Sequence, residues 1–172
     1  MPDPGSIAQP GPLAYFLTWT TYGSWLPGDE RGWVDGRGGM HVAEPLRATV
    51  ARRSMKEDAV LLAGPQRVTV ERSIAGLCAV RGWHLHAAQC RTQHVHVVVT
   101  AATTSPDEVL RQLKAWCTRG LRLTVGGNET AEPRRRWWTE GGSRRQVFRE
   151  SDLVSVITYV TECQEGPHAS RR

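Results

Sequence analysis

The sequence predicts an α+β sandwich of the ferredoxin-like type, with an antiparallel sheet and one extra helix at its C-terminal end. Short runs rich in β-branched and aromatic residues indicate strands. Two longer segments with apolar residues at helical spacing indicate helices. In chain order these elements follow the pattern strand, helix, strand, strand, helix, strand, which is the order of that fold. A last amphipathic helix comes after them.

The first half of the chain predicts one strand and one clear helix. Residues 13–22 combine aromatic and β-branched side chains and read as the first strand. Residues 27–39 are rich in glycine and charge but lack the spacing of a phosphate-binding loop, so we expect a loop and no nucleotide cofactor. A short helix is expected over 44–55. The apolar positions from Val70 onward then predict a helix that ends at the cap residue Gly82.

The second half predicts a hairpin, a capped helix, a basic strand and the last helix. Residues 83–90 and 93–101 are expected to pair across a two-residue turn at Arg91 and Thr92. Ser105 and the proline after it form a typical helix start. The remaining elements are a strand or hairpin within 134–148 and a helix over 151–163 with Leu153, Val156, Ile157 and Val160 on its apolar face.

Length and composition limit the class of protein. A chain of 172 residues is long enough for one domain, which we expect over 13–165, between a disordered leader (1–12) and a flexible tail (166–172). No apolar run is long enough to span a bilayer, and the start lacks the pattern of a signal peptide, so we expect a cytoplasmic, nucleoid-associated protein with no membrane partner. The net charge of +5 favours a polyanionic partner. The four cysteines are far apart and predict neither a zinc site nor a disulfide framework.

The most informative stretch is the strand that begins with His94, Val95 and His96. Alternation along a strand places His94 and His96 on one face, where they could share a cation, and Val95 on the other. Two histidines on a strand are also common as packing residues, so both interpretations stay open. A second pair, His84 and His86, lies on the preceding strand. The two-residue turn would put His84 on the opposite face, which favours a structural role.

Tyr159 lies beside the apolar stripe of the last helix, where it is either a boundary residue or a nucleophile directed at a metal held by His94 and His96. A tyrosine hydroxyl has a pKa near about 10, so it would attack phosphorus only with help from a divalent cation. Two imidazoles would need a third ligand, from Gln164, Glu162 or the substrate. Such a site would bind Mg²⁺ loosely and Mn²⁺ better.

Basic residues and tryptophans gather in the second half of the chain. They indicate either a solvated basic face or a surface that binds DNA phosphates and stacks on bases. The candidate DNA-binding residues are Lys114, Arg119, Arg134, Arg135, Arg136, Trp137, Trp138, Arg144 and Arg145.

Five stretches together resemble the HUH tyrosine transposases, the single-strand transposases of small insertion sequences, and most closely their REP-associated relatives. They are FLTWTTYGSWLPGDERGWV (16–34), HVHVVV (94–99), LKAWCTRGL (113–121), WWTEGGS (137–143) and YVTECQ (159–164). The resemblance covers nearly the whole chain after residue 13. It implies a ferredoxin-like nuclease that binds and cuts single-stranded DNA hairpins. REP-associated members tend to act as monomers and insertion-sequence relatives form dimers, so a monomer is the favoured state and a dimer the alternative.

The resemblance also assigns roles to individual residues. His94 and His96 would hold Mg²⁺ or Mn²⁺, and Tyr159 would form a 5′-phosphotyrosine. In the family a glutamine one helical turn after the tyrosine completes the metal site. This chain departs from that pattern, because Cys163 occupies that place and the glutamine follows at position 164. Gln164 is therefore the preferred third ligand, with Glu162 as its rival.

Two other functions are compatible with the same residues. One is a non-cleaving nucleic-acid-binding regulator derived from a transposase; both histidines and Tyr159 are present together, which argues against it. The other is a metal-dependent hydrolase that activates water, for which Tyr159 would be dispensable. The sequence lacks the paired carboxylates that such a hydrolase usually requires.

Overall fold

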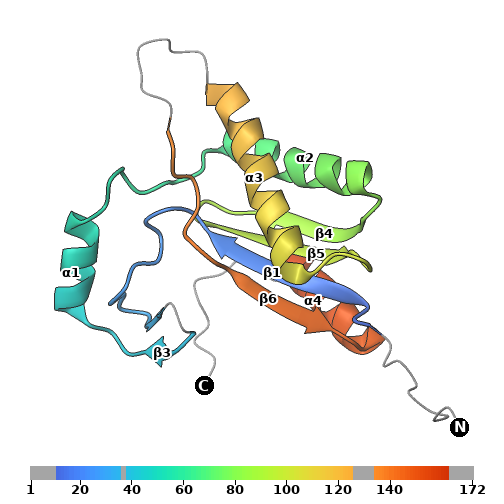
Figure 1. Ribbon diagram of the computed structural model, residues 1–172, viewed down its shortest axis with the longest axis horizontal. Coiled ribbons are helices and arrows are strands. Elements are labelled where there is room, and N and C mark those ends of the chain that lie inside the picture. Colours follow the sequence, from blue (N-terminus) through green and yellow to red (C-terminus); the bar gives the residue numbers. More distant parts are fainter. Residues whose placement is uncertain (1–10, 36–37, 126–133, 163–172) are drawn as a thin grey trace, which may run out of the picture.

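Four strands form one antiparallel sheet in the order β4-β5-β1-β6 (Figure 1). The computed structural model describes residues 11–35, 38–125 and 134–162. The strands are β1 (Ala14–Thr20), β4 (His84–Cys90), β5 (His94–Thr100) and β6 (Ser143–Val147). Because β1 lies between β5 and β6, with β4 outside β5, the strand order is that of the ferredoxin-like sandwich, as predicted.

Two helices, α2 (Gly64–Arg81) and α3 (Pro106–Val125), pack together on one face of the sheet (Figure 1). Helix α2 ends and α3 begins where the sequence predicts, since Gly82 caps α2 with a left-handed φ of 67° and Ser105 Oγ accepts the amide of Glu108 at the start of α3. The apolar stripe of α3 is entirely buried: Val109, Leu110, Leu113, Cys117 and Leu121. Together with Val95 and Val97, these side chains form part of the larger core, in which the burial of each valine or leucine contributes about 1.5–3 kcal/mol.

The last helix, α4 (Glu150–Glu162), covers the opposite face of the sheet and packs mainly on β4 and β5. Val156 and Val160 are buried against Ala87 and Val98 in a second, smaller core. The residues chosen from their spacing in the sequence are therefore the ones that dock this helix.

The segment between β1 and α2 holds a small unit that the sequence did not predict in full. The expected loop contains β2 (Trp33–Val34), which pairs with β3 (Met40–His41), and the short helix α1 (Pro45–Arg53) follows close to its expected place. No residue of α1 is buried, and the helix stands away from the main sheet in Figure 1. Arg47 links it to the small sheet, because its guanidinium lies 4.6 Å from the Trp33 ring centroid.

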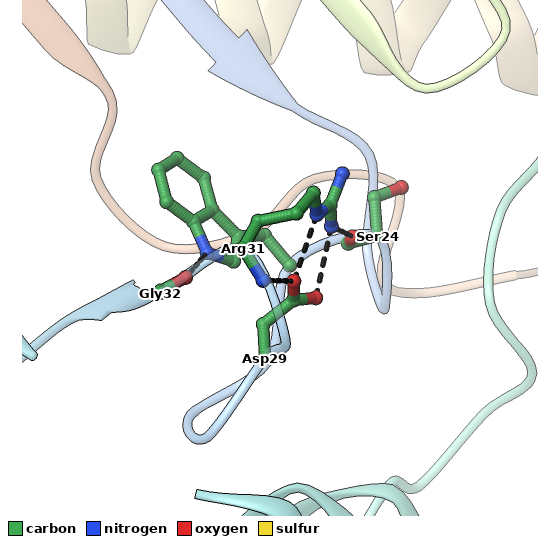
Figure 2. A network of polar contacts seen from close by, with 5 residues as sticks. Ser24, Asp29, Arg31 and Gly32 are labelled. Atoms are coloured by element: carbon green, nitrogen blue, oxygen red, sulfur yellow. Dashed lines mark hydrogen bonds and ion pairs between the residues drawn. The ribbon is translucent and has the colours of Figure 1, made fainter. Parts of the chain in front are cut away.

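Arg31 organises the turn that leads into this small unit (Figure 2). Its guanidinium donates to both carboxylate oxygens of Asp29 and to the carbonyl of Ser24, at 2.7–2.9 Å. The same contact lowers the pKa of Asp29. The indole of Trp25 closes the turn by donating to Gly32 O at 2.7 Å.

The hairpin of β4 and β5 differs from the prediction in its register. Gln89, not Ala87, is the partner of His96, so the turn lies one residue later than expected. A register shift between Leu85 and Ala87 then places His84 opposite Thr100. Since a one-residue shift moves a side chain to the other face, His84 lies on the same face as His96, and the prediction of the opposite face was wrong.

Within the ranges that the structure describes, no helix is long and apolar enough to cross a membrane. Most of the expected leader and the whole of the expected tail lie outside these ranges, as do Cys163 and Gln164.

The turn before β6 makes a close approach that should be intolerant of any side chain. A Cβ at Gly142, where φ is 147°, would lie 2.8 Å from Thr18 O and 3.0 Å from a methyl of Leu110. We expect Gly142→Ala to lower the free energy of unfolding by about 1–3 kcal/mol, because the turn must move away from β1. Gly141→Ala is the matched control: the position has a φ of 74° but no neighbour within 4 Å, so only the backbone cost of about 1 kcal/mol remains. If urea unfolding showed the same loss of unfolding free energy for both variants, the steric explanation would be contradicted.

Candidate functional site

One row of side chains crosses the sheet at the level of His96. The register pairs His96 with Thr18 of β1 on one side and with Gln89 of β4 on the other, and pairs Thr18 with Ser143 of β6. Paired residues of neighbouring strands project from the same face, so all four lie on the face that α4 partly covers. His94 is two residues earlier in β5 and lies on that face as well.

The last helix brings Tyr159 to this row. The Tyr159 ring is perpendicular to the ring of His96, with the centroids 5.9 Å apart, and the rings of His94 and His96 are 4.9 Å apart. Phe16 of β1 contacts both partners: its ring stacks on His96 at 5.9 Å and meets Tyr159 edge-on at 6.1 Å. Tyr159 is 41% exposed. The three residues singled out in the sequence thus come together within one chain, while their chemical roles remain predictions.

The environment of His96 favours its neutral form. The side chain is only 7% exposed, and its Nδ1 lies 3.0 Å from Thr18 Oγ1. Burial lowers the pKa of His96 to about 4, and the electrostatic interactions with the neighbouring His94 and Arg91 act in the same direction. A neutral imidazole keeps one nitrogen lone pair, which is what a metal ion requires.

A third donor beside the two histidines can come from three places. Glu162, the rival ligand of the sequence prediction, is the last residue of α4 and is exposed. Gln164, the preferred ligand, lies outside the described residues. Gln89 was missed by the sequence analysis, because its position opposite His96 follows only from the observed register. Its Oε1 is buried and has no hydrogen-bond partner among the described residues.

These donors fit a divalent cation held by few protein ligands. In the described ranges, no group of three His, Cys, Asp or Glu side chains could hold a metal ion. Two imidazoles and a buried amide oxygen remain, and this mixture of nitrogen and oxygen suits Mn²⁺ better than Mg²⁺. The donor set is therefore compatible with the predicted cation.

The second histidine pair lies at the other end of the same face. His84 and His86 have ring centroids 4.5 Å apart, and His86 Nε2 lies 2.8 Å from the hydroxyl of Thr100. Thr100 follows His96 by four residues in β5, which separates the two pairs by about 13 Å along the strand. Burial lowers the pKa of His86. The pair is thus far from Tyr159, and its hydrogen bond to Thr100 is consistent with a structural role.

The two tryptophans of the predicted stacking surface are parts of the fold. Trp137 is buried in the larger core, so it is not available to stack on a base, and this part of the prediction was wrong. Trp138 is half-buried and donates its indole N–H to Thr118 Oγ1. Lys114 is also engaged, because its ammonium donates to Thr139 O at 2.6 Å and Gly141 O at 2.9 Å. Its burial lowers its pKa. Lys114 therefore holds the turn before β6 in place.

The arginine run divides into one structural residue and two exposed ones. Arg134 bonds to the carbonyl of Asp58 and pairs with the carboxylate of Glu57 at 3.7 Å. Glu57 also accepts hydrogen bonds from the backbone amides of Arg135 and Arg136. The side chains of these two arginines are exposed. The run lies along the end of β1 that pairs with His94, since the segment after it bonds to the backbone of residues 20–22.

The arginines of β6 project from opposite faces. Arg144 pairs with Leu17 and forms an ion pair with Asp107 at 2.5 Å, so it belongs to the face covered by α2 and α3. Arg145 is exposed and pairs with Phe16, which touches both His96 and Tyr159. Only Arg145 of this pair therefore lies beside the candidate site.

Arg119, the last predicted DNA-binding residue, is on the helix face of the sheet. Its guanidinium lies 5.0 Å from the ring centroid of Trp116 on the same helix, α3. Since α3 and α4 cover opposite faces, Arg119 lies across the sheet from Tyr159.

The solved structures that this chain is similar to include two of low sequence identity. No protein-family model matches the sequence, and no curated protein matches it. A candidate transposase of Deinococcus radiodurans is 14% identical, with a TM-score of 0.48 over 97% of this chain and 100% of its own. A REP-associated tyrosine transposase bound to a REP hairpin is 11% identical, with a TM-score of 0.45 over 93% of this chain and 70% of its own. The function is therefore argued from the site itself.

The burial of His96 predicts how the site responds to acid. Because its folded-state pKa is near 4 and its ordinary value is near 6.5, the unfolded chain binds a proton between these pH values and the folded chain does not. We expect the folded protein to lose stability as the pH falls from about 6.5 towards 4. The His96 ring signal in proton NMR, assigned with His96→Gln, should titrate below pH 5. A midpoint near 6.5 would contradict the buried, neutral imidazole.

Proposed function

We propose that this protein cuts single-stranded DNA at hairpins and rejoins strand ends, with Tyr159 as the nucleophile, the chemistry of the HUH tyrosine transposases. The observation that carries the proposal is the proximity of the Tyr159 ring to His96 and, through it, to His94 on one face of the sheet. A hydroxyl nucleophile beside two imidazoles that can hold a divalent cation is what a phosphoryl transfer of this kind requires.

The proposed reaction exchanges one phosphodiester for another. Tyr159 loses its proton, and its oxygen forms a bond to phosphorus while the bond from phosphorus to the 3′-oxygen breaks. The 3′-oxygen takes up a proton and leaves as a hydroxyl, and the 5′-phosphate stays on the tyrosine. Attack by another 3′-hydroxyl reverses these steps and joins a new strand. The phosphotyrosine retains the energy of the broken bond, so no nucleotide cofactor is needed.

A divalent cation, Mn²⁺ or Mg²⁺, would be held by His94 and His96, with Glu162, Gln89 or Gln164 as a third ligand. When bound, it would neutralise charge on the phosphate oxygens and orient the phosphate in line with the nucleophile. The protein's own contribution is positional. Phe16 touches both His96 and Tyr159 and so keeps the nucleophile beside the imidazoles.

The DNA would approach the exposed edge of the site, where Tyr159 and Arg145 reach the surface. Arg145 is the exposed cation next to Phe16, and Arg135 and Arg136 are exposed near the end of β1. Arg134, Arg144 and Lys114 already have protein partners and are less suited to binding phosphate. We also propose that one chain suffices, since Tyr159 and both histidines meet within a single copy.

The covalent intermediate tests the proposal directly. Single-stranded hairpins from DNA flanking the gene are incubated with the protein and Mn²⁺, and the mixture is run on a denaturing protein gel. We expect a slower, DNA-containing band that EDTA and Tyr159→Phe both abolish, because the phenyl ring cannot form the ester. Tyr22→Phe, which removes a hydroxyl that accepts the Lys56 amide away from the site, should leave the band intact.

The alternatives predict different outcomes in the same assay. Cutting that survives Tyr159→Phe would favour a hydrolase that activates water. Tight hairpin binding with no cut would favour a non-cleaving regulator.

The neighbouring arginines of β6 test which face binds DNA. Arg145→Gln should weaken hairpin binding and reduce the slope of log K against log salt by about 0.7, the value for one phosphate contact on a single strand. Arg144→Gln is the matched control: it removes the same charge one residue away, on the other face, and should leave the slope unchanged. A larger effect at Arg144 would place the DNA on the helix face instead.

A further inference from the structure

The side chain of Thr18 makes a contact that no part of the proposed function uses. Thr18 lies in the middle of β1, directly opposite His96, and its Oγ1 is 3.0 Å from His96 Nδ1. We propose that Thr18 is a positioning residue that keeps the proton of His96 on Nδ1 and so leaves Nε2 free to bind a cation. This inference rests on the proposed function, because it assigns a partner to one of the proposed metal ligands.

The chemistry of imidazole makes the tautomer important. A neutral ring carries one N–H and one nitrogen lone pair, and the hydrogen bond at one nitrogen decides which form is present. If Nδ1–H donates to the Thr18 hydroxyl, the lone pair lies on Nε2, at the far side of the ring. If the hydroxyl donates to Nδ1 instead, Nε2 carries the proton and cannot bind a metal ion. Metal-binding histidines in proteins usually show the first arrangement, with the distal N–H given to an oxygen.

The surroundings of His96 restrict the ring from three directions. Phe16, two residues before Thr18 on the same face of β1, stacks on the ring at an interplanar angle of 18°. Tyr159 stands at 90° to it on the α4 side. Thr18 contacts the nitrogen edge itself. The two aromatic rings thus limit the plane of the imidazole, whereas the hydroxyl discriminates between its two nitrogens.

The backbone of Thr18 is itself held in place. Gly142 approaches so closely that an added Cβ would lie 2.8 Å from Thr18 O. The preceding carbonyl, Gly141 O, is bonded by the ammonium of Lys114 at 2.9 Å. The turn before β6 therefore packs directly behind the strand position that faces His96. A hydroxyl on a fixed strand can maintain one hydrogen-bond geometry, as a positioning residue must.

The test uses three variants of the full chain. Thr18→Val keeps the shape of the side chain and removes the acceptor, and Thr18→Ser restores the hydroxyl. Thr20→Val makes the same change two residues further along the same face, opposite His94, where the hydroxyl donates to Thr139 Oγ1. Two quantities are measured for each: binding of Mn²⁺ alone, by loss of its free electron paramagnetic resonance signal, and the tautomer of His96 without metal, by ¹⁵N–¹H NMR.

We expect wild type to carry the His96 proton on Nδ1. Thr18→Val should shift the tautomer towards Nε2–H and weaken Mn²⁺ binding about 10- to 100-fold, the usual loss when the partner of a ligating histidine is removed. Thr18→Ser should recover most of both properties, and Thr20→Val should leave the His96 tautomer as in wild type, because its hydroxyl is not the one that contacts His96 Nδ1. Rescue by serine separates positioning from packing, because serine lacks the methyl group but keeps the hydroxyl.

Two results would overturn the inference. One is a wild-type His96 with its proton on Nε2, and the other is a Thr18→Val protein with unchanged tautomer and Mn²⁺ affinity. Failure of the proposed function looks different. A wild-type protein that binds no Mn²⁺ would refute the metal site, while the NMR measurement on the metal-free protein would still decide whether Thr18 sets the tautomer.

Discussion

The pairing of β1 with β5 is the constraint on which the rest of the site depends. It places Thr18 beside His96 and, since strand side chains alternate, puts Phe16 on the same face and Leu17 in the core behind. A one-residue slip would turn the histidines into the apolar core and expose valines. Burial of Val95, Val97 and Val99 therefore stabilises the fold and at the same time fixes the direction in which the imidazoles point.

The second element of the site is helix α4, which packs on the sheet face that carries His94 and His96. Val156 and Val160 dock α4 on β4 and β5, in a core that also buries Ala14 of β1 and Val147 of β6, whereas Arg145 of β6 stays exposed. Tyr159 lies at the border of the docked stripe, close to His96 yet partly exposed. The proposed role of Tyr159 as a nucleophile requires a side chain that is held by its neighbours and still reachable by a large substrate. Its position at the edge of the docked helix is compatible with both requirements.

The basic residues show how far a charge count can mislead. Arg144 and Arg145 look equivalent in the sequence. In the structure Arg144 forms an ion pair with Asp107 on the helix face, whereas Arg145 is paired with Phe16. Trp137 looked like a stacking platform and is part of the core. Lys114 looked like a phosphate ligand and is bonded to two carbonyls. Each of these residues has its contacts with residues far away in the sequence, and a local sequence pattern does not reveal such contacts.

The sequence alone determined the fold class, the strand and helix positions, and the grouping of His94, His96 and Tyr159 as candidates. These features depend on periodicity, capping residues and residue type, which are local properties of the chain. Only the tertiary structure decided which residues accompany them: Thr18 and Gln89 beside His96, Phe16 between His96 and Tyr159, and Arg145 at the open side. Those neighbours follow from strand register, which relates segments up to about 130 residues apart in the chain. A bulge or a shifted turn changes which residues are paired and which face a side chain lies on, and neither is visible in the local sequence.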